Sequence, residues 1–155
     1  RPDRVGNFHR ALDNEVVRLA FGEFCRRTLS SENVEFVRQV RELHRSSSAK
    51  GTTAEQLREK LRFIAEKFLG TESDTEVNVK GSSRVDALCA IEAALEASKN
   101  YRGGAKNNGE GPWAWVLATA ATDSLVHLAR DVHPLIFDGI WPRFLLSDEF
   151  QDMMN

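Results

Sequence analysis

Apolar side chains recur at every third or fourth position along almost the whole chain, and no stretch alternates apolar and polar residues for long. This period is typical of one face of an α-helix, whereas a half-buried β-strand would need a period of two. The 155 residues are close to the usual size of one domain, and 41% hydrophobic residues can fill a single core. The sequence therefore predicts one all-α domain over residues 1–155, with its core between residues 8 and 150.

Signals for helix ends divide this pattern into eight or nine helices. Ser30 or Ser31 is expected to cap a helix that continues to about residue 45. Residues 53–56 read as a capping box, and the helix that follows is expected to stop at Gly70. Short connections between such helices are typical of a helix bundle, which is an architecture that many functions share.

The longest predicted break lies between two long helices. Residues 103–112 contain four glycines and a proline, which a helix does not tolerate. We therefore expect a flexible insertion over about residues 101–112. The helix before it is predicted to begin at Ser82 or Ser83, and the helix after it is predicted to begin near Trp113 and to be disrupted at Pro134. The residues expected on the buried face of the helix before the insertion are Val85, Leu88, Cys89 and Leu95.

Composition argues against several functions. The net charge of -2 gives no cationic field that could hold nucleic acid. Cys25 and Cys89 look like small buried apolar residues of a reduced intracellular protein, and neither they nor the four histidines have the spacing of metal ligands. We therefore expect no metal and no cofactor. No apolar run approaches the roughly 20 residues that cross a bilayer, so no membrane span is expected.

Two short segments place an asparagine close to the start of a predicted helix. Glu32 and Asn33 fall in an opening turn, where side chains and the positive end of the helix dipole face outward. Asn78 lies between two valines in a polar break, so that its amide could project while its neighbours fix the backbone, and Arg84 follows in the next helix. Each residue also has an ordinary explanation: helix capping for Asn33, an Asx turn for Asn78 and a solvated helix position for Arg84.

A third segment, residues 141–145, reads WPRFL. Together the three segments resemble the Gα-contacting segments of the regulator of G-protein signalling (RGS) domain, and the resemblance runs from about residue 8 to residue 150. It implies an RGS-like bundle of eight to nine helices with an enlarged Gly-rich loop between two long helices. The site residues that it implies are Glu32, Asn33, Asn78, Arg84, Asp138 and Arg143.

The third segment departs from the family pattern in one respect. The family carries an acidic residue four positions before the arginine, whereas this chain has Gly139 there and Asp138 one position further back. Either the segment has slipped by one residue or the acidic contact is lost. Such a change could alter the preference among Gα subunits or weaken activity.

The resemblance also implies a function. The chain is expected to be a GTPase-activating protein that stabilises the hydrolysis transition state of a GTP-bound Gα subunit, with no catalytic chemistry of its own. It is expected to be a cytoplasmic monomer. Gα or flanking domains could recruit it to the inner face of the plasma membrane. The alternative is an RGS-homology scaffold that binds Gα or another partner without accelerating hydrolysis. No motif supports an enzyme built on a helical bundle.

Overall fold

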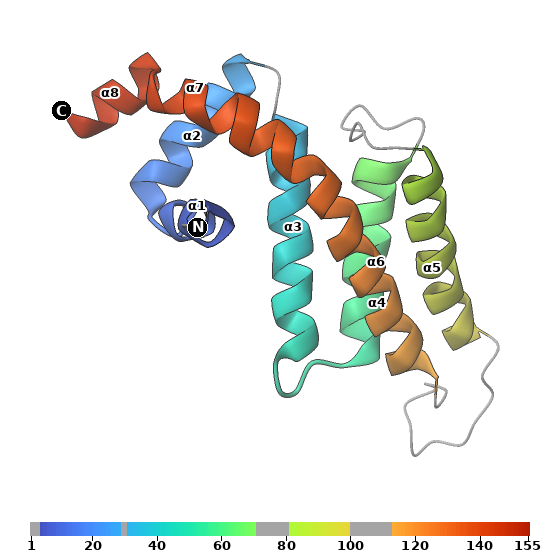
Figure 1. Ribbon diagram of the computed structural model, residues 1–155. Helices are drawn as coiled ribbons and strands as arrows, with labels where there is room; N and C mark the ends of the chain where they lie inside the picture. The colour runs from blue at the N-terminus through green and yellow to red at the C-terminus, as the bar shows by residue number, and fades with distance from the viewer. Residues whose placement is uncertain (1–3, 29–30, 71–80, 100–112) are drawn as a thin grey trace. The chain divides into compact units, whose positions relative to one another are not determined.

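The computed structural model describes residues 4–28, 31–70, 81–99 and 113–155, which form eight α-helices, two π-helical segments and no strand (Figure 1). The predicted all-α fold is confirmed. The chain divides into two compact units, which are described separately. The terminal unit comprises Arg1–Val34 and His133–Asn155, and the middle unit comprises Glu35–Val132. No helix in the described ranges is long and apolar enough to cross a membrane.

The terminal unit is built from short helices around α2. Its elements are α1 (Arg4–Leu12), α2 (Glu15–Arg27), the first turn of α3 (Ser31–Ser48), the end of α6 (Ala114–Pro134), the π-helical segment η3 (Leu135–Ile140), α7 (Trp141–Leu145) and α8 (Asp148–Met154). Helix α2 packs against both α1 and α8, and α7 contacts η3 and α8. The Asn14 side chain caps α2 by accepting hydrogen bonds from the backbone N–H groups of Val16 and Val17 at 2.9 and 3.3 Å.

A cluster of aromatic rings forms the core of the terminal unit. Phe8 of α1 meets Trp141 of α7 edge to face, with 5.0 Å between ring centroids. Phe21 of α2 likewise meets Phe144 at 5.0 Å, and Phe137 of η3 lies 5.2 Å from Phe8. Such pairs are each worth about 0.5–1.5 kcal/mol beyond the area that they bury. The cluster therefore joins α1, α2, η3 and α7 by specific side-chain contacts.

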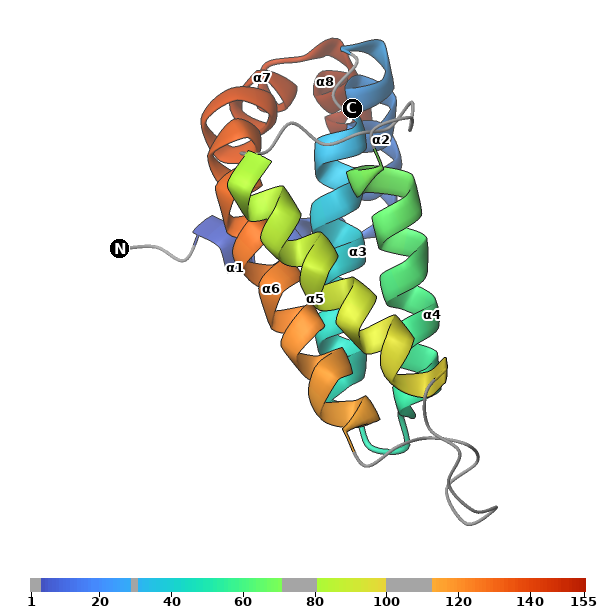
Figure 2. The same cartoon turned by 90° about the vertical axis from the view of Figure 1, so that its right-hand side faces the viewer.

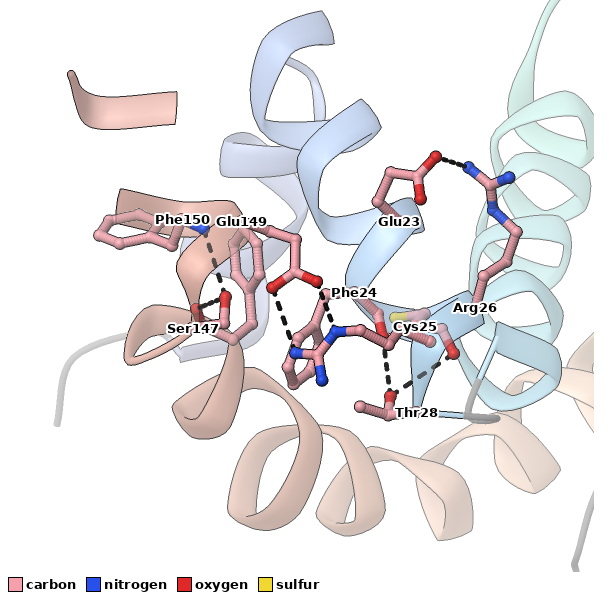
Figure 3. A network of polar contacts seen from close by, with 10 residues as sticks. Glu23, Phe24, Cys25, Arg26, Thr28, Ser147, Glu149 and Phe150 are labelled. Carbon is pink, nitrogen blue, oxygen red and sulfur yellow. Dashed lines mark hydrogen bonds and ion pairs between the residues drawn. The ribbon is translucent and has the colours of Figure 1, made fainter. Parts of the chain in front are cut away.

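Helix α8 is fixed at its first turn (Figure 3). The Ser147 hydroxyl donates to the Phe144 carbonyl oxygen at 2.6 Å and accepts from the Phe150 N–H at 3.2 Å, so it caps the helix. Arg27 of α2 donates to both carboxylate oxygens of Glu149, and its guanidinium hydrogen bonds hold the pKa of that carboxyl below its usual value. The same interaction raises the pKa of Arg27.

The middle unit is a bundle of longer helices. It contains α3 from Glu35 onward, α4 (Ala54–Ile64), the π-helical segment η1 (Ala65–Leu69), α5 (Gly81–Lys99) and α6 as far as Val132. Figure 2 shows α3, α4, α5 and α6 lying side by side, and α5 packs against α4 and η1. The largest buried side chains of this bundle are Phe36, Leu43, Leu57, Leu61, Ile64, Phe68, Leu69, Ile91, Leu125 and Leu128.

The predicted capping box at the start of α4 is confirmed. The Thr53 hydroxyl oxygen accepts from the Gln56 N–H at 3.2 Å, while the Gln56 side-chain oxygen accepts from the Thr53 N–H at 2.9 Å. The end of α3 differs from the expectation, whereas the helical run that begins with α4 stops at Gly70 as predicted. Helix α3 continues to Ser48, where the Ser47 hydroxyl donates to the His44 carbonyl oxygen at 2.7 Å. The helical run after α4 ends in the η1 π turn, and Gly70 follows in an extended conformation.

The buried face of α5 was predicted wrongly at two of its four residues. Val85 is 56% exposed and Cys89 is exposed, whereas the buried residues of α5 are Ala87, Ile91 and Ala94. Apolar side chains occur on all sides of this helix, so a period of 3.6 does not single out one face. Small alanine side chains make up much of the buried face, Leu88 and Leu95 are half-buried, and Val85 and Cys89 are left exposed.

Candidate functional site

The first predicted contact segment is the opening turn of α3. Glu32 and Asn33 are both half-buried, and the helix begins at Ser31, so Asn33 lies inside the helix rather than at its cap. The Asn33 side-chain oxygen is inaccessible to solvent, and no group in the described residues donates a hydrogen bond to it. The capping explanation for Asn33 is therefore not supported. An acceptor buried without a donor costs about 1–3 kcal/mol.

A buried phenylalanine anchors the helix that carries these two residues. Phe36 of α3 is fully buried and meets Phe68 of η1 at 5.5 Å between ring centroids, within the middle unit. This contact fixes α3 within the middle unit.

The third predicted segment contains a π turn. The Trp141 N–H donates to the Ile136 carbonyl oxygen, five positions back instead of four, so one turn of helix holds one extra residue. Ile136, Ile140 and Phe144 are all buried at four-residue intervals. In a regular α-helix each such step would rotate the side chain by about 40°. The π turn takes up this rotation and keeps the three side chains on one face.

The same register sorts the outward residues into two rows. Leu135, Gly139 and Arg143 follow one another at four-residue intervals, and Asp138 and Pro142 form the neighbouring row. Asp138 and Arg143 are both exposed. Gly139, rather than Asp138, therefore stands one turn before Arg143.

The Arg143 side chain folds back onto this glycine. Its Nε donates to the Gly139 carbonyl oxygen at 3.0 Å. Within the described part of the chain, no carboxylate forms an ion pair with Arg143. A Cβ atom added at Gly139 would meet no atom within 4 Å, so the space above the glycine is open. The Gly139 carbonyl was not foreseen as part of the site, although the four-residue spacing of the buried apolar residues is visible in the sequence.

The remaining two predicted residues are placed differently. Arg84 is half-buried in the first turn of α5, which belongs to the middle unit, whereas Glu32, Asn33, Asp138 and Arg143 belong to the terminal unit. Asn78 lies outside the described residues, as does the predicted insertion at residues 101–112. The structure thus groups four of the six predicted residues in one unit.

The described residues offer no evident alternative site. They contain no group of three or more His, Cys, Asp or Glu side chains that could hold a metal ion. An open polar hollow of about 690 Å³ lies between the end of α3 and the start of α4, where Lys60 donates to Ser46 at 2.6 Å. None of the six predicted residues lines this hollow.

Comparison with known proteins gives one positive result. The family model described as "Regulator of G protein signaling domain" matches residues 7–153, which is nearly the whole chain and includes all six predicted residues. No curated protein matches the chain.

Proposed function

Because the chain belongs to the regulator of G-protein signalling family, we propose that it accelerates GTP hydrolysis by a heterotrimeric Gα subunit and thereby ends the signal. Gα subunits carry their own catalytic arginine and the glutamine that orients the attacking water. The domain then needs no acid, base or nucleophile of its own. It acts by holding the switch segments of Gα in the geometry of the transition state.

The buried side-chain oxygen of Asn33 supports this proposal most directly. It is an acceptor without a donor among the described residues, at the start of a helix that is fixed by a buried aromatic contact. The Asn33 side chain as a whole is half-buried, so a turn of its amide would bring this oxygen to a backbone N–H or side-chain donor of a switch segment. Because the free domain already bears the cost of burying this oxygen, the hydrogen bond in the complex contributes nearly its full strength.

The energies required are modest. A hundredfold acceleration corresponds to about 2.7 kcal/mol of tighter binding to the transition state than to the ground state. A hydrogen bond contributes about 0.5–1.5 kcal/mol, and more when one partner is charged. Two or three bonds from Asn33, Asn78 and one of the arginines Arg84 and Arg143 would be sufficient, with Glu32 and Asp138 completing the contact set. The proposed partner is GTP-bound Gα at the inner face of the plasma membrane, engaged by one copy of the domain.

The test is a single-turnover GTPase assay with a panel of Gα subunits, together with binding of the domain to each Gα in two states. We expect faster hydrolysis with at least one subunit. We also expect much tighter binding to Gα with GDP and aluminium fluoride, which imitates the transferring phosphoryl group, than to Gα with GDP alone. Unchanged hydrolysis across the panel would contradict the proposal.

A second candidate function rests on Gly139. The position one turn before Arg143 carries no side chain, so a contact from an acidic residue there is not available. A domain that has lost a contact specific to the transition state could still hold Gα as a scaffold. If the domain is such a scaffold, it should bind Gα with GDP alone and Gα with GDP and aluminium fluoride equally tightly, and it should not accelerate hydrolysis.

A further inference from the structure

We infer that Ser48, at the exposed end of α3, is a phosphorylation site for a serine kinase that recognises an arginine three positions before the acceptor. Arg45 supplies this arginine. Figure 2 shows this end of α3 at the turn that leads into α4. The inference does not rest on the proposed function, because it needs no Gα subunit and uses none of the six predicted contact residues.

The first observation is the charge around the acceptor. Three consecutive serines, at positions 46–48, follow Arg45. Residues 43–54 contain Arg45 and Lys50 but no aspartate or glutamate. Arg45, Ser48 and Lys50 are all exposed. Kinases select substrates partly by charge, and an acidic substrate groove favours a hydroxyl with basic neighbours. The end of α3 therefore presents an accessible hydroxyl in a basic stretch.

The second observation separates this serine from a second one with the same spacing. A serine or threonine follows an arginine by three positions at two places in the chain, Ser48 after Arg45 and Ser30 after Arg27. Arg27 is held by Glu149 through both carboxylate oxygens, so a kinase would have to displace that pair. No carboxylate of the described residues pairs with Arg45. The structure therefore favours Ser48 over Ser30, although the sequence makes them alike.

The third observation is that the last turn of α3 is weakly held. A kinase takes its acceptor serine in an extended segment, so this turn has to open. The Ser47 hydroxyl donates to the His44 carbonyl oxygen at 2.7 Å, and the Ala49 N–H reaches only the Ser46 carbonyl oxygen, three positions back, at 3.2 Å. No residue from 44 to 53 is buried. Opening this turn therefore exposes no core side chain and should cost little free energy.

The reaction is an ordinary phosphoryl transfer from ATP bound to the kinase. The Ser48 hydroxyl oxygen forms a bond to the γ-phosphorus, the bond from that phosphorus to the oxygen bridging the β- and γ-phosphates breaks, and ADP leaves. The hydroxyl proton passes to the catalytic aspartate of the kinase. The product carries about -1.5 to -2 charges, which offsets the positive charges of Arg45 and Lys50. Arg45, one helical turn before Ser48, is also placed to pair with the phosphate.

The experiment uses the folded domain as the substrate. The domain is incubated with ATP and the catalytic domain of calmodulin-dependent protein kinase II, whose substrates need an arginine three positions before the serine, and the phosphate is located by tandem mass spectrometry. We expect the phosphate on Ser48. Ser48→Ala should lower incorporation at least tenfold, whereas Ser30→Ala should lower it less than twofold.

A second pair of variants tests the arginine. Arg45→Gln should lower the rate of incorporation at least tenfold, because it removes the charge that the kinase reads. Arg130→Gln is the matched control: Arg130 is an exposed arginine of α6 with a histidine three positions later, so its replacement should leave the rate unchanged. Thermal melting shows whether each of the four variants is folded.

Three results would overturn the inference. The first is phosphate mainly on Ser30 or on another residue. The second is an unchanged rate in an Arg45→Gln domain that melts cooperatively. The third is no incorporation into the folded domain. A peptide of residues 41–52 then gives the reason: if the kinase modifies the peptide, the last turn of α3 does not open, and if it does not, the basic stretch is not recognised.

Discussion

Arg27 holds Glu149 through both carboxylate oxygens, with N···O distances of 2.6 and 3.2 Å, although the two residues are 122 positions apart. The pair ties the C-terminal helix α8 to the end of α2, the last described helix before α3. The Arg27 guanidinium also lies over the Phe24 ring, 5.4 Å from its centroid. The Arg27 side chain is 59% exposed and the Glu149 side chain 19%, so the contact is a bidentate pair at the edge of the core.

This pair predicts how stability depends on pH. The pKa of Glu149 is lowered in the folded protein, so its contribution is complete above the ordinary glutamate pKa of about 4.3 and is lost as the pH falls through the lowered value. We expect Glu149→Gln to lower the melting temperature at pH 7 and the difference from the parent to shrink towards pH 3. Glu23→Gln is the control, because the Glu23–Arg26 pair is largely exposed at both ends and should contribute little at any pH. A difference that stays constant from pH 7 to pH 3 would contradict the assignment.

Removing the cap of α8 should cause a moderate loss of stability. Ser147→Ala removes the acceptor of the Phe150 N–H and the donor to the Phe144 carbonyl oxygen, two hydrogen bonds of a buried hydroxyl. We expect the free energy of unfolding in urea to fall by about 1–2 kcal/mol. Ser48→Ala, at the exposed end of α3, should change it by less than about 0.5 kcal/mol.

Removing a ring of the aromatic cluster in the third segment should lower the free energy of unfolding much more. Phe144 is fully buried and contacts Phe21, Trp141 and Phe150. Phe144→Ala should destabilise the protein by about 3–5 kcal/mol, because it removes a large side chain from a packed site. Leu146, two residues later, is 85% exposed, so Leu146→Ala should change the free energy of unfolding by less than about 0.5 kcal/mol. Equal effects of the two substitutions in urea unfolding would show that the packing of this segment is wrongly described.

Replacing either of the two asparagines by alanine should reduce activity without reducing stability. Asn33→Ala deletes a side-chain oxygen that accepts no hydrogen bond from the described residues, so the melting temperature should stay the same or rise. We expect GTPase stimulation to fall about tenfold. Asn78→Ala, at a position known here from the sequence alone, should abolish most of the stimulation. A fall of several degrees in the melting temperature, with stimulation per folded molecule intact, would instead assign these residues to the fold.

Local patterns in the sequence predicted the fold class and the best-defined helix starts. The capping box of Thr53 and Gln56 was recognised because it depends only on residue types at fixed spacing, and the structure confirms both of its hydrogen bonds. Asn33 was singled out by its position near a helix start. Its buried oxygen could not be predicted, because burial depends on parts of the chain that are distant in sequence.

Two features were missed for a different physical reason. A search for a 3.6-residue period assumes that every turn is α-helical, and it cannot detect a π turn such as the one between Ile136 and Trp141. In α5 the period is weak because alanines make up much of the packed face, so Val85 and Cys89 were assigned to the interior by their hydrophobicity. The side that a helix buries is decided by its neighbours, which the sequence of one helix does not describe.

The prolines on either side of the π turn have a consequence for local motion. Neither Pro134 nor Pro142 has a backbone N–H, so Pro134 removes a donor from the last turn of α6, just before η3, and Pro142 removes one at the start of α7, just after it. Segments with missing ladder bonds open at a lower free energy than the rest of the protein. Amide hydrogens of η3 should therefore exchange with deuterated solvent earlier than those near Leu57 and Leu61 in α4, although the aromatic contacts of Phe137, Trp141 and Phe144 hold the side chains of this region in place.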